Sequence, residues 1–388
     1  MNFFQEEIKK LKKKGLYRTL NVIESAQGPI VKSGGRDFLL FSSNNYLGLA
    51  NHPELKKAAK EAIDKYGVGT GASRLISGNM ALHKELEDEI TKFKETEAAL
   101  LFTSGYMVNV SVISALTDRD DVVIIDKLCH ASIVDGCRLS KAKLQIYPHN
   151  DINALEKILK RNINKIKKLI VTEGVFSMQG SISSLPEILF LAKKYKALIL
   201  LDDAHATGIL GNKGRGTCEY FDIKDESIIQ MGTFSKALGS LGGFIAGSKS
   251  IINYLRNKTR SFIYSTALPP AVLATSIKAL EIIKNNPELR GELWKKVGCL
   301  KNKLKELGYN ILNSPSQIIP IIIGDNEKVL KFSKFLYEKG IFIPAIRTPT
   351  VSKGTERLRV TIMSNHKEDD LNYLLNVLSD LKRVGLVL

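Results

Sequence analysis

The sequence predicts an α/β fold, with a mostly parallel seven-stranded sheet covered by helices and a smaller α+β domain towards the C-terminal end. Short segments that are apolar throughout alternate with amphipathic segments of helical periodicity, which is typical of parallel strands buried on both faces. The chain has 388 residues, which is enough for a large domain and a smaller one.

The N-terminal part is expected to lie outside the large domain. Residues 1–25 have the pattern of a basic amphipathic helix followed by a linking segment. Residues 28–41 (GPIVKSGGRDFLLF) predict a short strand pair that turns at Gly34-Gly35. We therefore expect three parts along the chain: 1–50, an N-terminal helix and strand segment; 51–285, the large α/β domain; and 286–388, a small α+β domain.

The elements of the large domain follow from hydrophobic periodicity. Helices are expected over residues 52–66 and 80–93, where apolar residues recur at helical spacing. Strands are expected over seven apolar segments: 98–102, 122–126, 143–147, 168–173, 198–202, 228–231 and 243–247.

The C-terminal part mixes both patterns. Helices resume over about 270–307, and a last amphipathic helix is expected over 368–384. Between them, residues 316–323, 327–339 and 357–362 suggest further elements of a small α+β domain.

Composition narrows the function classes. Hydrophobic residues make up 44% of the chain and charged residues 25%, and no apolar run is long enough for a membrane span. The first residues contain acids and lack an apolar core, so we expect no signal peptide and a cytoplasmic protein. The net charge of +17 fits a lysine-rich surface first and an anionic substrate second. We expect no nucleic acid or membrane partner.

The four cysteines suggest neither a metal site nor a disulfide framework. They stand at positions 129, 137, 218 and 299, without a CxxC pair, so we expect reduced thiols and no metal. The adjacent pair Cys129-His130 could suggest a thiol nucleophile, but adjacency in sequence is not the arrangement that such enzymes use.

In open parallel sheets, ligands bind at the carboxyl ends of the strands. The polar residues that directly follow the apolar segments are therefore candidates for a binding site. Ser104-Gly105-Tyr106 opens a helical segment and suits a phosphate, because a helix N-terminus presents unpaired N–H groups. Asp202 ends a buried strand with His205 close behind, and Lys236 stands alone in the small-residue loop GTFSKALG. A lysine, a buried carboxylate and a phosphate site together match the needs of pyridoxal phosphate.

A glycine-rich segment offers a competing interpretation. Residues 67–72 (GVGTGA) match the GxGxxA pattern of dinucleotide-binding proteins. That pattern must follow a strand and open a helix, whereas here it follows the helical segment ELKKAAKEAIDKY. A glycine-rich loop near an active-site mouth is the preferred interpretation.

Long motifs resemble the fold-type I pyridoxal phosphate enzymes, and more closely their α-oxoamine synthase family. The resemblance extends over nearly the whole chain. It rests on LLDDAHATG (200–208), GTFSKALG (232–239), FSSNNYLGLANHP (41–53), GTGASRLISGN (69–79), HASIVDGCRLSKA (130–142), TEGVFSMQG (172–180), RSFIYSTALPP (260–270) and RTPTVSKGTERLRVT (347–361).

The resemblance implies a role for each matching residue. Lys236 would bind the cofactor covalently and act as general base, while Asp202 would pair with the pyridine nitrogen. His205 would hydrogen-bond the ring oxygen, and His130 would stack on the ring and lie near the substrate. The remaining cofactor contacts would be Ser104, Gly105, Tyr106, Ser177 and Thr233, with Ser265 and Thr266 reaching the phosphate of a partner subunit in a homodimer. The substrate contacts would be Arg18, Asn44, Arg347, Thr350 and Arg359, with Arg359 on the amino acid carboxylate.

The family's reaction condenses an amino acid with an acyl thioester and releases carbon dioxide. HASIVDGCRLSKA and FIYSTALPP most resemble the member of the biotin pathway, which implies L-alanine and a pimeloyl thioester of coenzyme A or of an acyl carrier protein. The glycine-dependent acetyltransferase of the same family is the close alternative. An aminotransferase or side-chain lyase would use the same lysine and aspartate, and a ligand-sensing regulator on this fold is a more distant alternative.

Overall fold

A computed structural model describes residues 2–383. Its contacts define two compact units. The larger unit comprises Asn44–Ser177 with Ser181–Glu292, and the smaller takes the rest of the described chain. The division predicted from sequence, 1–50, 51–285 and 286–388, stays a prediction.

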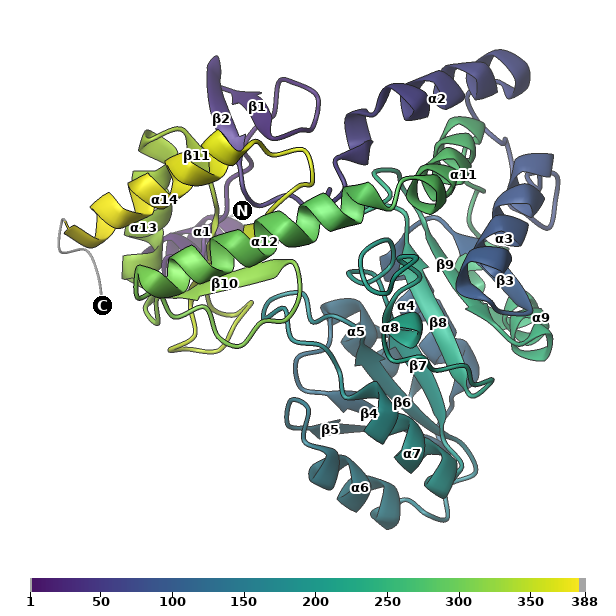
Figure 1. The fold of residues 1–388 in the computed structure, drawn as a ribbon. Coiled ribbons are helices and arrows are strands. Elements are labelled where there is room, and N and C mark those ends of the chain that lie inside the picture. Colours follow the sequence, from purple (N-terminus) through teal and green to yellow (C-terminus); the bar gives the residue numbers. More distant parts are fainter. Residues whose placement is uncertain (1, 384–388) are drawn as a thin grey trace. The chain divides into compact units, whose positions relative to one another are not determined.

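The larger unit contains the predicted seven-stranded sheet. Its strands lie in the order β3-β9-β8-β7-β6-β4-β5, as Figure 1 shows. All neighbours pair in parallel except β9, which is antiparallel to both β3 and β8. The bounds are β3 Ala98–Phe102, β4 Val122–Asp126, β5 Lys143–Tyr147, β6 Lys168–Glu173, β7 Leu198–Asp202, β8 Ile228–Thr233 and β9 Gly243–Gly247.

Successive side chains of the central strands face two different cores. Leu200 and Ile229 pack in the core formed with α4 (Gly105–Leu116), α5 (Ala131–Ser140), α9 (Lys249–Lys258) and α10 (Arg260–Ile263). Leu201 and Ile228 pack in the core formed with α6 (Ile152–Arg161), α7 (Leu185–Tyr195) and α8 (Thr217–Tyr220). Because side chains alternate along a strand, Asp202 shares the face of Leu200, and Asp203 shares that of Leu201.

Three further helices complete this unit. They are α2 (Pro53–Tyr66), α3 (Ala81–Lys94) and α11 (Pro270–Asn285), and α11 packs against both of the others. The glycine-rich segment 67–72 follows α2 directly, which agrees with its interpretation as a loop that does not bind a dinucleotide. The short 3₁₀ helix η1 (Leu49–Asn51) precedes α2.

The smaller unit contains two three-stranded sheets. One has the order β1-β2-β11 and the other β10-β13-β12. The predicted hairpin at Gly34-Gly35 is present, since β1 and β2 pair in an antiparallel register with Ser33 opposite Arg36. The bounds are β1 Ile30–Ser33, β2 Arg36–Leu40, β10 Ile318–Ile322, β11 Ile341–Phe342, β12 Ala345–Ile346 and β13 Arg357–Thr361.

The remaining helices differ from the sequence prediction in detail. They are α1 (Phe3–Lys13), α12 (Glu288–Glu306), α13 (Asn326–Glu338) and α14 (Glu368–Arg383). The helices predicted over about 270–307 are α11 and α12, and Pro287 separates them because it lacks the N–H that a continuous helix needs. The predicted last residue of the final helix, 384, lies outside the described residues. None of the described helices is long and apolar enough to cross a membrane.

Candidate active site

A cavity of about 200 Å³ lies at the carboxyl end of the parallel strands. Four of its lining residues come from the loops that follow strands and connect the sheet to its helices, as expected for an open parallel sheet. The lining residues are Ser104, Gly105, Tyr106, Asn109, His130, Ser132, Glu173, Asp202, Ala204, His205, Met231, Thr233, Ser235 and Lys236.

The N-terminus of α4 forms one wall. The Ser104 hydroxyl caps this helix by accepting a hydrogen bond from the Met107 N–H at 3.3 Å. A Cβ at Gly105 would lie 2.9 Å from the end of the Met231 side chain, so glycine lets the start of the helix lie close to β8 without displacing that side chain. The first N–H groups of α4 therefore face a space where an anion would be stabilised.

Hydroxyl groups stand beside that helix end. Thr233 Oγ1 donates to the Gly242 carbonyl at 2.6 Å and lies 2.8 Å from Ser235 Oγ. The Ser235 hydroxyl, in an exposed residue, belongs to the same wall of the cavity. The helix N–H groups and the Ser235 hydroxyl are the kind of donors that bind a phosphate, whereas the Thr233 hydroxyl gives its proton to Gly242.

Asp202 is held at both of its carboxylate oxygens. Asn109 Nδ2 donates to Asp202 Oδ2 at 2.7 Å, and the Ala204 N–H donates to Asp202 Oδ1 at 3.0 Å. The residue is only 5% exposed, so its carboxylate would be costly to bury without these donors. Its charge is therefore fixed in place and directed into the cavity.

A chain of hydrogen bonds extends from Asp202 to His130. Asn109 Nδ2 also donates to Ser132 Oγ at 3.0 Å, and Ser132 Oγ lies 2.8 Å from His130 Nδ1. Burial lowers the pKa of His130 and the nearby Lys236 lowers it further, while Asp202 opposes both. The ring of His130 is thus oriented through its Nδ1, and its neutral form is favoured.

His205 is held from the other side of the cavity. Its Nδ1 lies 2.7 Å from the hydroxyl of the buried Tyr46, whose hydroxyl also donates to Asn44 Oδ1 at 3.1 Å. The predicted substrate residue Asn44 is thus connected with the predicted cofactor residue His205 within one unit. Tyr46, which the sequence analysis did not select, makes this connection.

Lys236 follows β8 in a loop anchored by buried residues. Phe234 and Leu238 are fully buried on either side, while Lys236 itself is half-buried and lines the cavity. Gly239 adopts a φ of +65°, and a Cβ there would lie 2.4 Å from the Ala50 N. The small residues of GTFSKALG thus allow a tight turn that brings the lysine to the cavity.

Glu173 is a site residue that the sequence analysis did not select. It ends β6, lies opposite Asp202 in the parallel register and is 2% exposed. Burial first, and then the charge of Asp202, raise the pKa of Glu173 to about 8. The only sequence signal was its place at the end of a buried strand, which it shares with Asp202.

The other predicted cofactor residues belong to the same unit, but three of them, Ser177, Ser265 and Thr266, do not line the cavity. Tyr106 lines the cavity, with its hydroxyl donating to Asp135 and its ring edge-to-face with His130. Ser177 does not line the cavity, but its N–H donates to Glu173 Oε2 at 3.2 Å. Ser265 and Thr266 line a different, small cavity near Arg74.

The predicted substrate residues Arg18, Arg347, Thr350 and Arg359 belong to the smaller unit. Arg18 donates to Thr350 Oγ1 at 3.4 Å, and Arg347 donates to the carbonyls of Gly15 and Tyr17. Arg359 is buried on β13, opposite Pro320 of β10. The structure thus groups three of these four residues within their own unit.

The alternative thiol nucleophile finds no support in the geometry. Cys129 donates weakly to the Val171 carbonyl at 3.6 Å, and burial raises the pKa of its thiol well above the ordinary value. His130 directs its Nδ1 to Ser132. A thiol held in its neutral form is a poor nucleophile.

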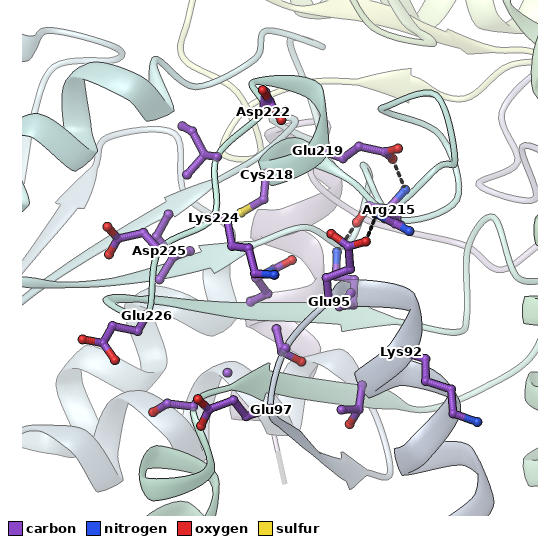
Figure 2. Close-up of a pocket in the computed structure, with 18 residues that line it drawn as sticks. Lys92, Glu95, Glu97, Arg215, Cys218, Glu219, Asp222, Lys224, Asp225 and Glu226 are labelled. Carbon is purple, nitrogen blue, oxygen red and sulfur yellow. Dashed lines mark hydrogen bonds and ion pairs between the residues drawn. The ribbon is translucent and has the colours of Figure 1, made fainter.

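A larger cavity, of about 770 Å³, is lined by Cys218 and Ile228, which belong to the face of the sheet opposite to that of Asp202. Figure 2 shows charged side chains of both signs around it, with Arg215 between Glu95 and Glu219. The buried Lys94 reaches Asp203 at 3.1 Å on this side. None of the predicted site residues lines this cavity, so its size does not make it the active site.

Comparison with known proteins assigns the chain to a family. The family model of aminotransferase class I and II matches residues 36–378. The chain belongs to this family. Within it, "Putative 8-amino-7-oxononanoate synthase" of Acetivibrio thermocellus is 49% identical over 99% of both chains. The 8-amino-7-oxononanoate synthase of Thermoanaerobacter pseudethanolicus is 48% identical over 96% of this chain and 94% of its own.

Solved structures agree with this family assignment. A serine palmitoyltransferase from S. paucimobilis, with a bound PLP–myriocin aldimine, superimposes with a TM-score of 0.94 at 32% identity over 100% of this chain and 98% of its own. The 8-amino-7-oxononanoate synthase of Francisella tularensis superimposes with a TM-score of 0.79 at 29% identity, over 90% of this chain and 99% of its own. The predicted α/β class and the resemblance to α-oxoamine synthases are confirmed.

The cavity of this family member fits pyridoxal phosphate. The N-terminus of α4 and the Ser235 hydroxyl beside it suit a phosphate, and the fixed Asp202 carboxylate suits a protonated ring nitrogen. Lys236 supplies an amine on the same cavity. Two side-chain oxygens of lining residues, Asn109 Oδ1 and Glu173 Oε1, lack hydrogen-bond partners within the described chain. These polar atoms can therefore form hydrogen bonds with a ligand.

Proposed function

We propose that this protein is an 8-amino-7-oxononanoate synthase that uses pyridoxal phosphate. It condenses L-alanine with a pimeloyl thioester, releases carbon dioxide and the thiol, and so contributes to biotin biosynthesis. The observation that carries the proposal is the meeting of Lys236, Asp202 and the N-terminus of α4 around one cavity, in a chain that matches such synthases over its whole length.

Pyridoxal phosphate supplies an aldehyde that binds amines and a ring that accepts electrons from the α-carbon of a bound amino acid. Asp202 binds the protonated ring nitrogen and stabilises the positive charge that draws these electrons. The N-terminus of α4 and Thr233 hold the phosphate, and His205 binds the ring oxygen. His130 covers the ring face.

Lys236 has two tasks in this account. Its amine would hold the aldehyde of the cofactor, and it would also take the proton from the α-carbon of the amino acid substrate. After the carboxyl group has left, Lys236 returns a proton to the same carbon. The half-buried position of the side chain beside the cavity is compatible with both tasks.

Residues of the smaller unit bind the substrates in this proposal. Arg359 binds the alanine carboxylate with its two-pronged guanidinium. Arg18, Arg347 and Thr350 line the side of the acyl thioester, whose thiol carrier is coenzyme A or an acyl carrier protein. The hydrogen bond from Arg18 to Thr350 supports their joint role.

The active protein is a cytoplasmic homodimer in this proposal. Ser265 and Thr266 complete the phosphate site of the partner subunit. Apolar side chains near them support an interface, since Leu75, Ile76 and Tyr264 are 55%, 80% and 72% exposed in the single chain. A β-bridge between Ser73 and Thr266 connects the two segments that carry these side chains.

Release of free thiol by the cofactor-loaded protein tests the proposed substrates. Alanine, glycine and serine are each tested with pimeloyl-, acetyl- and palmitoyl-coenzyme A. We expect release with alanine and the pimeloyl donor. Release with glycine and the acetyl donor, or with serine and the palmitoyl donor, would reassign the substrates. No release from any pair, carrier-protein thioesters included, would favour an aminotransferase.

A further inference from the structure

Two buried carboxyl groups lie side by side in the cavity, and the proposed function uses only one of them. Glu173 ends β6 and Asp202 ends β7, and they are register partners in these neighbouring parallel strands. Val171 and Leu200 face the same core, so Glu173 and Asp202 leave the sheet on the same face. Two negative charges on neighbouring side chains repel each other, so ionisation of both carboxyl groups is disfavoured.

The surroundings of the two carboxyl groups decide which of them keeps a proton. Asp202 accepts hydrogen bonds at both oxygens, from Asn109 Nδ2 and the Ala204 N–H, and these donors stabilise its ionised form. Glu173 accepts a hydrogen bond from the Ser177 N–H at Oε2, while its Oε1 is buried without a partner in the described chain. When the two groups share one proton, it is therefore more stable on Glu173 than on Asp202.

The charged groups around Glu173 act in both directions. Burial and the charge of Asp202 favour the acid, whereas the charge of Lys236 and the nearby backbone N–H groups of Ser177 and His130 favour the carboxylate. The thiol of Cys129 lies close enough to interact with Glu173 and is itself held neutral. The balance raises the pKa of Glu173 to about 8, so the acid form predominates at neutral pH.

We propose that Glu173 acts as a neutral carboxylic acid whose Oε1–H donates a hydrogen bond to an anionic oxygen of the molecule bound in the cavity. The unpartnered Oε1 belongs to a lining residue of the cavity, and a protonated carboxyl group has one donor to offer. This role rests on the proposed function for the identity of the ligand, which is pyridoxal phosphate. The Glu173 proton stays on Oε1 throughout, and no bond is formed or broken.

A pair of substitutions separates a neutral donor from a carboxylate. Glu173→Gln keeps the size and a neutral donor but cannot ionise, whereas Glu173→Leu removes the donor. The apoprotein of each variant is titrated with pyridoxal phosphate, and binding is followed by visible absorption between pH 6.5 and 9.5. Glu226→Gln makes the same chemical change at an exposed residue outside the cavity and serves as the control.

We expect Glu173→Gln to bind the cofactor within about threefold of the wild type at pH 7, and Glu173→Leu to bind roughly tenfold more weakly or worse. Wild-type affinity should fall as pH rises through about 8, when Glu173 ionises, relative to that of Glu173→Gln. Other titrating groups affect both proteins alike, so the difference between their profiles isolates Glu173. If Glu173→Gln binds as weakly as Glu173→Leu, or follows the wild-type pH profile, the neutral-donor role is wrong.

The pH dependence of the stability of the apoprotein is a second test of the raised pKa of Glu173, and it needs no ligand. An acid whose pKa is raised by folding favours the folded state below its unfolded pKa, and this contribution is lost as pH rises towards the folded pKa. As pH rises from 4.5, the ordinary pKa of a glutamate, to about 8, wild-type stability should therefore fall relative to that of Glu173→Gln. Parallel urea-unfolding profiles for the two proteins would contradict a raised pKa. Neither experiment uses the acyl thioester, so their outcome is independent of the thiol-release result.

Discussion

In the proposed mechanism, Lys236 stands alone among small residues because its amine has to reach a cofactor and then a substrate carbon. The buried neighbours Phe234 and Leu238 anchor the loop, and the left-handed Gly239 turns it. A solvated lysine in a charged cluster would stay protonated and would be a poor base. The isolation of this residue is thus a requirement of the proposed chemistry.

Replacing Lys236 by alanine should abolish turnover. The substitution removes the covalent attachment and the base, yet the half-buried side chain contributes little to the core, so the fold should survive. Thiol release measures turnover, and thermal unfolding measures the fold. Lys224→Ala, at an exposed lysine near the larger cavity, is the matched control. Wild-type turnover in Lys236→Ala would contradict the assignment of this lysine.

Asn109 should affect catalysis because its side chain positions Asp202. Asn109→Ala removes the donor to Asp202 Oδ2 and interrupts the chain to Ser132 and His130. Hydrogen bonds to charged groups contribute about 1.5–3 kcal/mol, so we expect roughly tenfold to hundredfold loss of kcat/KM. Steady-state kinetics with cofactor in excess measure the loss. Wild-type kcat/KM in this variant would show that Asp202 is positioned without Asn109.

The sequence pointed to the residues at strand ends but not to those that hold them. Lys236 and Asp202 follow apolar strands in recognisable motifs, and both line the cavity. Asn109 lies inside α4, where nothing in the local pattern distinguishes it from an ordinary helical residue. Its partner is 93 positions away, so only the tertiary structure reveals the pair.

At the scale of elements, the central strands were predictable because they are buried on both faces and so lack polar alternation. The edge strand β5 differs, since its sequence KLQIY alternates polar and apolar residues and Ile146 is 54% exposed. The extension of β8 to Thr233 was missed, since its last two residues, Gly232 and Thr233, are not apolar. The two-residue strands β11 and β12 were also missed. Segments this short carry no periodicity, and long-range pairing alone defines them.

A buried ion pair connects α3 with the end of β7. Lys94 Nζ lies 3.1 Å from Asp203 Oδ2, and both side chains are fully buried. Lys94→Met should destabilise the protein by about 3–5 kcal/mol, because it leaves the Asp203 charge buried without its cation. Urea unfolding at pH 7 measures this loss.

The double variant Lys94→Met/Asp203→Asn separates the charge from the packing. Neutralising Asp203 should recover most of the lost stability, since no buried charge then remains without a partner. If the double variant is no more stable than Lys94→Met, packing of the lysine side chain rather than its charge holds this junction.

At the scale of the whole molecule, the net charge of +17 and the exposed apolar side chains suggest different partners. The charge suits an anionic donor such as a coenzyme A thioester or an acidic carrier protein. The apolar residues Leu75, Ile76 and Tyr264 suit a second copy of the chain, because they flank the segment predicted to reach the partner's phosphate.

The dimer can be tested at one of these side chains. Ile76→Glu places a charge on the proposed interface, so we expect a shift from dimer to monomer in light scattering and a matching loss of thiol release. Ile166→Glu changes a residue that is 84% exposed on a different part of the unit, and it should leave both readings unchanged. A wild-type protein that is monomeric while fully active would exclude shared sites.

The central claim is a decarboxylative condensation, and carbon dioxide released from carboxyl-labelled L-alanine tests it most directly. The cofactor-loaded wild-type protein is given labelled alanine and a pimeloyl thioester, and labelled carbon dioxide and free thiol are measured together. Our account predicts one labelled carbon dioxide for each thiol, with 8-amino-7-oxononanoate as the product. Thiol release without labelled carbon dioxide would mean thioester hydrolysis, and it would contradict the proposed reaction.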